Sequence, residues 1–175
     1  MWRELRLIAL LSPASCAVLM PLEANINPRS CMGTWFVQRQ VPALAALEAG
    51  ARSGVEKYEW DDADNCISVQ YTFNRAKASD DDVTTVQQRG WVVSEQGTEW
   101  AVSPKVGPFF LPARLPFIIV DVDPEAYMIC SGGLDSWMYV MTRDKQPGEA
   151  LLDACMSTVE AAGFDMSKVL VMEQP

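Results

Sequence analysis

The chain has 175 residues, of which 49% are hydrophobic and 21% charged, and this composition is ordinary for one soluble globular domain. Its 23 acidic residues outnumber its 14 basic residues, which gives a formal charge of −9. No cluster of Lys and Arg interleaved with aromatic residues occurs, which argues against nucleic acid and anionic membrane surfaces as partners. Histidine is absent, which removes the usual general base near neutral pH and the commonest imidazole metal ligand. We therefore expect no enzyme and no metal site.

The N-terminal residues 1–30 are expected to form a leader-like or extended segment that precedes a domain at 31–175. A basic start is followed by an apolar run from Leu7 to Leu22 and by small residues near Ala24. This pattern resembles an export signal or the second half of a bipartite organelle-targeting sequence. Pro13 and Pro21 interrupt the run too early for a membrane span. The pattern predicts export to an extracytoplasmic space such as the periplasm, delivery to an organelle lumen such as the thylakoid lumen, or association with a membrane.

The five cysteines show no C-x-x-C spacing, so the sequence gives no support to a zinc site or a thioredoxin-like site. Two interpretations stay open for them, namely one or two disulfides, or buried thiols that act as small hydrophobic residues. The residues concerned are Cys16, Cys31, Cys66, Cys130 and Cys155.

From Gly33 onward, short β-rich runs alternate with polar or Gly/Pro-containing turns, which predicts an all-β barrel or sandwich. Eight strands are the number that closes an up-and-down antiparallel barrel around one small ligand. The predicted strands span 34–41, 55–61, 66–74, 83–94, 98–104, 115–122, 126–131 and 136–143. The acidic run 80–82 lacks the ligand spacing of a calcium site and is expected to be a solvated loop.

Strand faces follow from alternation with a period of two residues. The apolar side chains Ile67, Val69, Tyr71 and Phe73 share one face, and Tyr58 and Trp60 alternate with charged neighbours in the same way. The aromatic face of each strand is therefore expected to line the barrel interior.

Residues 147–163 change to helical spacing, with Pro147 in the first turn and Gly163 at the stop, and they predict one C-terminal α-helix. The segment 168–172 that follows is expected to be a short strand that pairs near the start of the first strand.

Several motifs resemble those of the lipocalin family. Gly33-Thr34-Trp35 resembles the Gly-x-Trp signature, and the segment 121–127 resembles the Asp-and-Tyr motif near the seventh strand. The segment 137–143 resembles the last barrel strand, in which Arg143 packs across the signature tryptophan. The resemblance covers roughly residues 31 to 174 and is nearest to the bacterial, plant and apolipoprotein D-like lipocalins, although Tyr139 stands where those usually have Trp. It implies a calycin barrel whose narrow end is closed by Trp35 and Arg143, a cation–π pair worth about 0.5–2 kcal/mol.

The resemblance also implies a ligand cavity at the open end of the barrel, next to the connection after the first strand. That connection, 42–52, is Ala-rich and is expected to form either a short helical cover or a packed surface loop. Arg39 is expected to face inward near the mouth, where it could meet a carboxylate, although an exposed or salt-bridged Arg is the alternative. The expected lining, from strand alternation and family position, is Val37, Arg39, Tyr58, Trp60, Tyr71, Phe73, Trp91, Trp100, Phe110, Phe117 and Tyr127.

These patterns favour a lipocalin-like binding protein for an apolar small molecule, such as a lipid, retinoid, carotenoid or tetrapyrrole. No cofactor is expected to be required, although a lipid or pigment could be bound. The alternative hypothesis is a non-catalytic structural or interaction subunit of a larger assembly, for example a photosynthetic membrane complex. Its motive is that the apolar N-terminal segment, if retained, could lie against protein partners.

Overall fold

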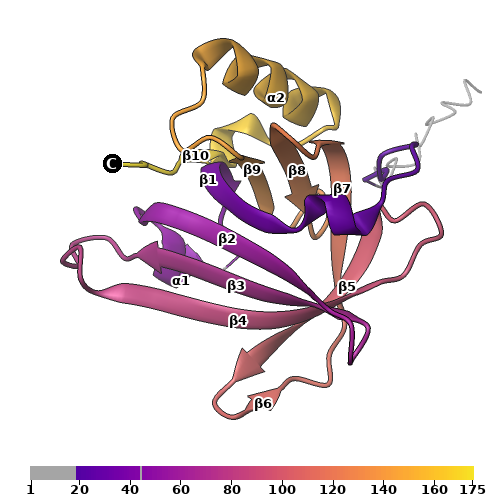
Figure 1. The fold of residues 1–175 in the computed structure, drawn as a ribbon. Coiled ribbons are helices and arrows are strands. Elements are labelled where there is room, and N and C mark those ends of the chain that lie inside the picture. The colour runs from indigo at the N-terminus through magenta and orange to yellow at the C-terminus, as the bar shows by residue number, and fades with distance from the viewer. Residues whose placement is uncertain (1–18, 44) are drawn as a thin grey trace, which may run out of the picture.

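The computed structural model describes residues 19–43 and 45–175, and a closed antiparallel β-barrel forms its centre (Figure 1). Strands follow one another around the barrel in chain order, and β9 pairs with β1 to close it. The barrel strands are β1 (Gly33–Val41), β2 (Arg52–Asp61), β3 (Cys66–Asn74), β4 (Val83–Val92), β5 (Glu99–Val106), β7 (Leu115–Asp123), β8 (Tyr127–Ser131) and β9 (Met138–Thr142). The predicted eight-stranded up-and-down barrel with one C-terminal helix is confirmed.

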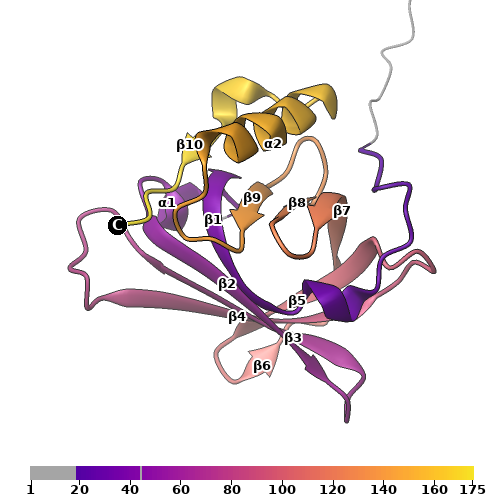
Figure 2. The same ribbon diagram turned by 45° about the horizontal axis from the view of Figure 1, so that its top comes forward.

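The remaining elements lie at the ends of the barrel or on its outside. They are η1 (Pro28–Cys31), α1 (Ala45–Glu48), β6 (Phe109–Phe110), α2 (Glu149–Ala161), η2 (Met166–Lys168) and β10 (Leu170–Val171). Helix α2 is the predicted C-terminal helix, and it lies across the outside of the barrel beside β8 and β9 (Figure 2). Strand β10 pairs with Arg39 and Gln40 at the end of β1, so the expected pairing near the start of that strand is wrong.

Alternation of side chains divides the apolar residues between two clusters, because successive residues of a strand point to opposite faces. The inner cluster fills the barrel and holds the aromatic residues of β1, β2, β3, β5 and β7. The outer cluster lies under α2, where Ile129 and Val140 pack against Cys155 and Val159. One wall of the barrel is therefore buried on both faces, which explains why β8 and β9 are almost continuously apolar.

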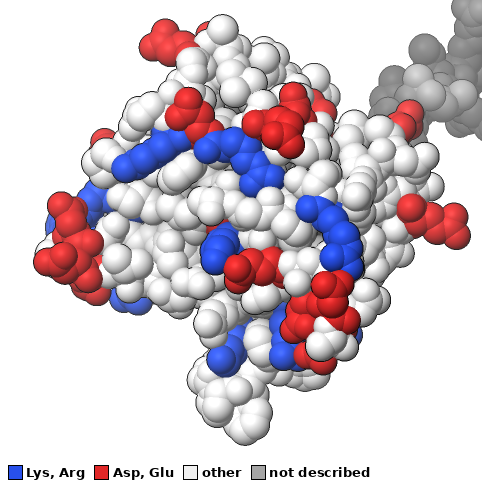
Figure 3. Space-filling view, in the orientation of Figure 1, with Lys and Arg blue, Asp and Glu red and all other residues white. Residues whose placement is uncertain are grey.

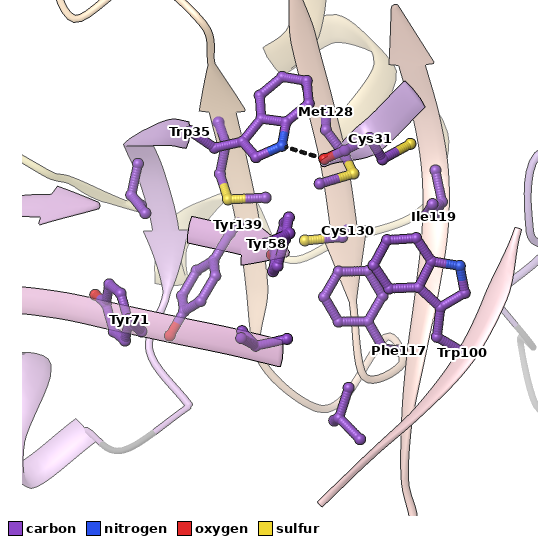
Figure 4. Packing of buried hydrophobic residues seen from close by; sticks show 14 of the residues in the cluster. Cys31, Trp35, Tyr58, Tyr71, Trp100, Phe117, Ile119, Met128, Cys130 and Tyr139 are labelled. Carbon is purple, nitrogen blue, oxygen red and sulfur yellow. Dashed lines mark hydrogen bonds between the residues drawn. The ribbon is translucent and has the colours of Figure 1, made fainter. Parts of the chain in front are cut away.

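Arg143 and Trp35 close the narrow end of the barrel, as the sequence predicts. The guanidinium carbon lies 3.5 Å from the centroid of the indole ring, which is fully buried. The indole nitrogen donates to the carbonyl of Cys31 at 2.8 Å (Figure 4). Gly33 has φ +101°, and a Cβ there would lie 3.1 Å from the guanidinium, so the position favours glycine both by conformation and by space.

The Arg143 guanidinium also donates hydrogen bonds to main-chain carbonyls of two chain segments, residues 30–34 and the β7–β8 turn. Its acceptors are the carbonyls of Ser30 (3.2 Å), Met32 (2.8 Å), Thr34 (3.0 Å) and Pro124 (2.8 Å). One side chain thereby joins the η1 segment, the start of β1 and the β7–β8 turn. A Lys could not reproduce this arrangement, because it has three donors and no planar face to stack.

The four described cysteines, Cys31, Cys66, Cys130 and Cys155, are buried and free. The buried-thiol interpretation therefore holds for these four, while Cys16 lies outside the described residues. Burial raises the pKa of the Cys155 thiol to about 11, so this group is a neutral hydrophobic filler near neutral pH.

The described part of the predicted N-terminal segment runs along the barrel. The amide of Leu22 donates to the carbonyl of Ile119 at 2.9 Å, and the amide of Ile26 donates to the carbonyl of Gln96 at 2.9 Å. Residues 1–18 of that segment lie outside the described residues. In the ranges 19–43 and 45–175, no helix has the length and apolar character needed to cross a bilayer.

Replacing Arg143 by Lys is expected to lower the free energy of unfolding by about 2 kcal/mol or more, because the stacking and most of the charge-assisted hydrogen bonds are lost. Urea denaturation with an unchanged m-value is the measurement. The matched control is Arg114→Lys, since Arg114 also stacks on an indole, that of Trp91 at 3.4 Å, but is exposed on the outside of the barrel. That change is expected to alter stability by less than about 0.5 kcal/mol. Equal effects of the two substitutions would contradict the role assigned to Arg143.

Candidate functional site

A cavity lies inside the barrel at the end opposite Trp35. Because neighbouring strands are antiparallel, the connections 42–51, 75–82, 107–114 and 132–137 all lie at this end, which we call the mouth. The cavity has a volume of about 190 Å³ and is partly open to solvent. Its lining consists of Ala43, Glu48, Glu56, Tyr71, Val86, Gln88, Val102, Pro104, Leu115, Phe117, Trp137 and Tyr139.

Aromatic rings form a wall along one side of the cavity through a chain of contacts, and Figure 4 shows three of these rings, Tyr71, Tyr139 and Phe117. The centroids of Phe117 and Trp137 are 5.5 Å apart, those of Trp137 and Tyr139 are 5.3 Å apart, and those of Tyr139 and Tyr71 are 5.6 Å apart. These spacings fall in the range preferred by offset and tilted aromatic pairs. Below this wall, Trp100 stacks on Phe117 at 4.9 Å. The wall is therefore rigid and presents ring faces and edges to whatever fills the cavity.

Two carboxylic acids lie in the cavity lining, Glu48 from α1 and Glu56 from β2. Glu48 accepts a hydrogen bond from the hydroxyl of Tyr139 at 2.7 Å, which ties the helix at the mouth to the far wall of the barrel. Glu56 is only 2% exposed, and its Oε2 atom has no hydrogen-bond partner within the described chain. The hydroxyls of Tyr58 and Tyr71 also lack a partner there. Such groups are rare in protein interiors, and they are typical of functional sites.

Burial sets the protonation of this cluster. Loss of hydration raises the pKa of Glu56 from 4.5 to about 7, the neighbouring Tyr58 hydroxyl opposes the rise, and Glu48 adds to it. Burial also raises the pKa of the Tyr71 and Tyr139 phenols, so both are neutral donors near neutral pH. The cavity is thus an apolar space with one carboxyl group that titrates near neutrality.

Comparison with known proteins identifies the family of this barrel. A family model described as a lipocalin-like domain matches residues 26–174. The chain belongs to the lipocalin-like domain family. No curated protein sequence matches it.

Solved structures resemble the lipocalin-like domain at low sequence identity. Insecticyanin from the tobacco hornworm Manduca sexta is 15% identical, with a TM-score of 0.70 over 93% of this chain and 87% of that one. Lobster apocrustacyanin A1 is 12% identical, with a TM-score of 0.63 over 93% of each chain. The cockroach allergen Per a 4 is 12% identical, with a TM-score of 0.60 over 87% of this chain and 90% of that one. At these identities the likeness shows a shared fold alone.

The residues predicted to contact a ligand fall into three groups in the lipocalin-like domain. Two of them, Tyr71 and Phe117, line the cavity. Four more, Val37, Tyr58, Phe73 and Trp100, are buried in the inner cluster without reaching the cavity surface, and Trp60 packs against that cluster while Arg29 covers its ring at 4.5 Å.

The third group lies on the outside of the barrel. Tyr127 packs against the outer cluster and its hydroxyl donates to Asp121 at 2.9 Å, so the Asp-and-Tyr motif is a structural contact. Trp91 lies under Arg114, and Phe110 lies beneath Arg89 at 4.6 Å. On β4 the residues Val86 and Gln88 line the cavity, so the odd-numbered Trp91 points outward.

Arg39 lies on the outside because β1 contains a β-bulge between Val37 and Arg39. Val37 is opposite Met141 of the inner cluster, whereas Arg39 is opposite Val140 of the outer cluster. The extra residue reverses the alternation that predicted an inward Arg39. Gln40 takes the inward position instead and donates to the carbonyl of Glu48 at 3.3 Å.

Most of the cavity lining, including both carboxylic acids, was not predicted from the sequence. Glu56 could have been found, since it shares a strand face with Tyr58 and Trp60 at a spacing of two residues. Trp137 and Tyr139 share a face with Met141 in the same way. Glu48 carries no such signal, because it lies in the connection at the mouth. Of the two interpretations of that connection, the short helical cover is confirmed by α1.

One group of potential metal ligands occurs among the described residues, formed by Asp61, Asp64 and Cys66 at the β2–β3 turn. The two carboxylates already have protein partners. Asp61 accepts from the amides of Ala63 and Asp64, and Asp64 pairs with Arg89 at 3.4 Å. The arrangement is that of an Asx-type turn with a surface ion pair.

The raised pKa of Glu56 makes stability depend on pH. A carboxyl group that is easier to protonate in the folded state contributes stability that is fully present below its unfolded pKa of 4.5 and is lost as the pH rises to about 7. At about 1.4 kcal/mol per pKa unit, the loss amounts to about 3 kcal/mol. Glu56→Gln, which stays neutral, is therefore expected to unfold at a higher urea concentration than the parent at about pH 8 and to remove this pH dependence.

The matched control for this measurement is Glu59→Gln on the same strand. Glu59 faces outward, is 62% exposed and pairs with Lys57, so its substitution is expected to leave the pH profile of stability unchanged. Parallel stability profiles for the parent and Glu56→Gln between about pH 5 and pH 8 would refute the buried, easily protonated Glu56.

Proposed function

We propose that this chain is a non-catalytic binding protein that holds an apolar small molecule in the cavity at the mouth of the barrel. The observation that carries the proposal is the cavity itself, which interrupts an otherwise filled barrel and is walled mainly by aromatic and aliphatic side chains. A concave, mostly apolar site with a few placed polar groups is typical of small-molecule pockets.

The volume of about 190 Å³ limits what the cavity encloses. An engineered cavity of about 150 Å³ holds one benzene molecule, so this one encloses a body of about one or two rings or a short chain. A longer lipid, retinoid, carotenoid or tetrapyrrole would extend through the mouth.

The rim of the mouth suits an apolar ligand of that kind. Val106, Phe109, Leu111 and Leu115 belong to the β5–β6–β7 connection or border it, and Phe109 is 75% exposed. The tip of this hairpin carries no charged side chain on the face shown in Figure 3. An apolar rim gives a ligand a surface to contact before it enters.

Two predictions rest on the N-terminal sequence alone. They are the localisation, by export or in an organelle lumen, and the alternative function as a structural subunit of a larger assembly.

A substitution that fills the cavity tests the proposal. Val86→Phe adds a ring at the cavity wall and is expected to weaken binding of neutral one- and two-ring molecules, such as 2-phenylethanol and indole, by about tenfold or more. Titration calorimetry is the measurement, because indole has the same fluorophore as Trp137, which lines the site. The thermal midpoint of each variant verifies that it is folded.

The control is Val83→Phe, the same change on the outer face of the same strand, where Val83 is 51% exposed. It is expected to bind like the parent. Unchanged binding in Val86→Phe, or no binding of any apolar molecule by the parent, would contradict the proposed function.

A further inference from the structure

Resting on the proposed function, we infer that the ligand carries a protonated amine, which binds Glu56 and the Tyr71 hydroxyl while its apolar body contacts the aromatic wall. The cavity is thus a site for small amphiphilic amines. Three independent features of the lining support this ligand class.

The first feature is a pair of buried oxygen atoms without a hydrogen-bond partner, although the Tyr58 hydroxyl lies close enough to Glu56 to lower its pKa. Glu56 Oε2 and the Tyr71 hydroxyl have no hydrogen-bond partner in the described chain, and both side chains line the cavity at 2% and 3% exposure. A buried carboxylate without a partner is costly, and it is normally paired with a cation or with several donors. An ammonium group has donors only, so it can satisfy the carboxylate and the phenol oxygen together.

The second feature is the sign of the charge. Among the described residues that line the cavity, the ionisable groups are Glu48, Glu56, Tyr71 and Tyr139, and none is Lys or Arg. The one cation expected here, Arg39, lies on the outer face of β1. The cavity therefore attracts cations and repels carboxylates, which sets aside a fatty acid anion as the ligand.

The third feature is the aromatic wall. Tyr71, Tyr139, Trp137 and Phe117 form one surface next to the carboxylic acids. A cation placed beside such rings gains cation–π attraction, which is strongest where water is excluded. A neutral alcohol gains none of this, although it could donate one hydrogen bond to Glu56.

The site is also expected to respond to pH, because the amine binds the ionised form of Glu56. The titratable groups that face Glu56 are Glu48 from α1, Tyr58 on its own strand, Tyr71 from β3, Cys130 from β8 and Tyr139 from β9, and none of them is a cation. Burial holds the pKa of Glu56 at about 7. Affinity for an amine should therefore rise about tenfold between about pH 6 and pH 8 and then level off.

Three isosteric probes test the inference by calorimetry on the full chain: 2-phenylethylamine, 2-phenylethanol and phenylacetate. At about pH 8 the amine is expected to bind at least about tenfold more tightly than the alcohol, and phenylacetate more weakly than both. Glu56→Gln should reduce amine affinity about tenfold or more and leave alcohol affinity within about twofold. Glu59→Gln, with its carboxylate on the outer face, should bind all three probes like the parent.

The outcomes separate this inference from the proposed function. Equal binding of amine and alcohol, or full amine affinity in Glu56→Gln, would overturn the amine inference and leave the apolar cavity as a binding site. Absence of binding for every probe, together with no effect of Val86→Phe, would overturn both. A tenfold preference for the amine that disappears in Glu56→Gln and falls at low pH would establish the inference.

Discussion

The closure of one barrel end by Arg143 determines at which end of the barrel a ligand cavity can lie. The guanidinium stacks on the buried Trp35 and donates hydrogen bonds to carbonyls from the η1 segment, β1 and the β7–β8 turn, which closes the narrow end. Between that end and the cavity, Trp100 stacks on Phe117 in the barrel interior. The cavity lies toward the mouth, next to the short helix α1. The position of the cavity is thus a consequence of the closure.

The cavity is a place where the domain gives up stability. Polar atoms of Glu56, Tyr58 and Tyr71 are buried without partners, and Glu56 loses hydration that no cation replaces in the described chain. Residues that oppose folding in this way commonly mark functional sites, where the compensating interaction comes from a ligand. The aromatic wall and the two carboxylic acids therefore lie in one cavity, and the barrel strands hold the aromatic wall and Glu56 in position.

Strand alternation predicted an all-β barrel or sandwich, because side chains on a sheet are sorted between two faces, and the lipocalin-like motifs then favoured the barrel. The helix, the order of strands and the closing pair of Trp35 and Arg143 were predicted as well. The site was predicted poorly for two reasons. Aromatic residues such as Trp91 and Tyr127 also occur on the outer face, where they pack against Arg114 or α2, so residue type does not identify the interior. Glu48 lies in a connection, where no periodicity exists to place it.

The bulge in β1 changes which side chains of that strand face the barrel interior. Inserting one residue near Gln38 leaves the strand in the barrel but exchanges the faces of the two positions that follow, so a guanidinium is outside and an amide is inside. Backbone register, together with the acidic side chains of the lining, thereby affects the electrostatic sign of the interior. A barrel of this kind can acquire a new ligand class through a single insertion or deletion in one strand, with every lining residue type retained.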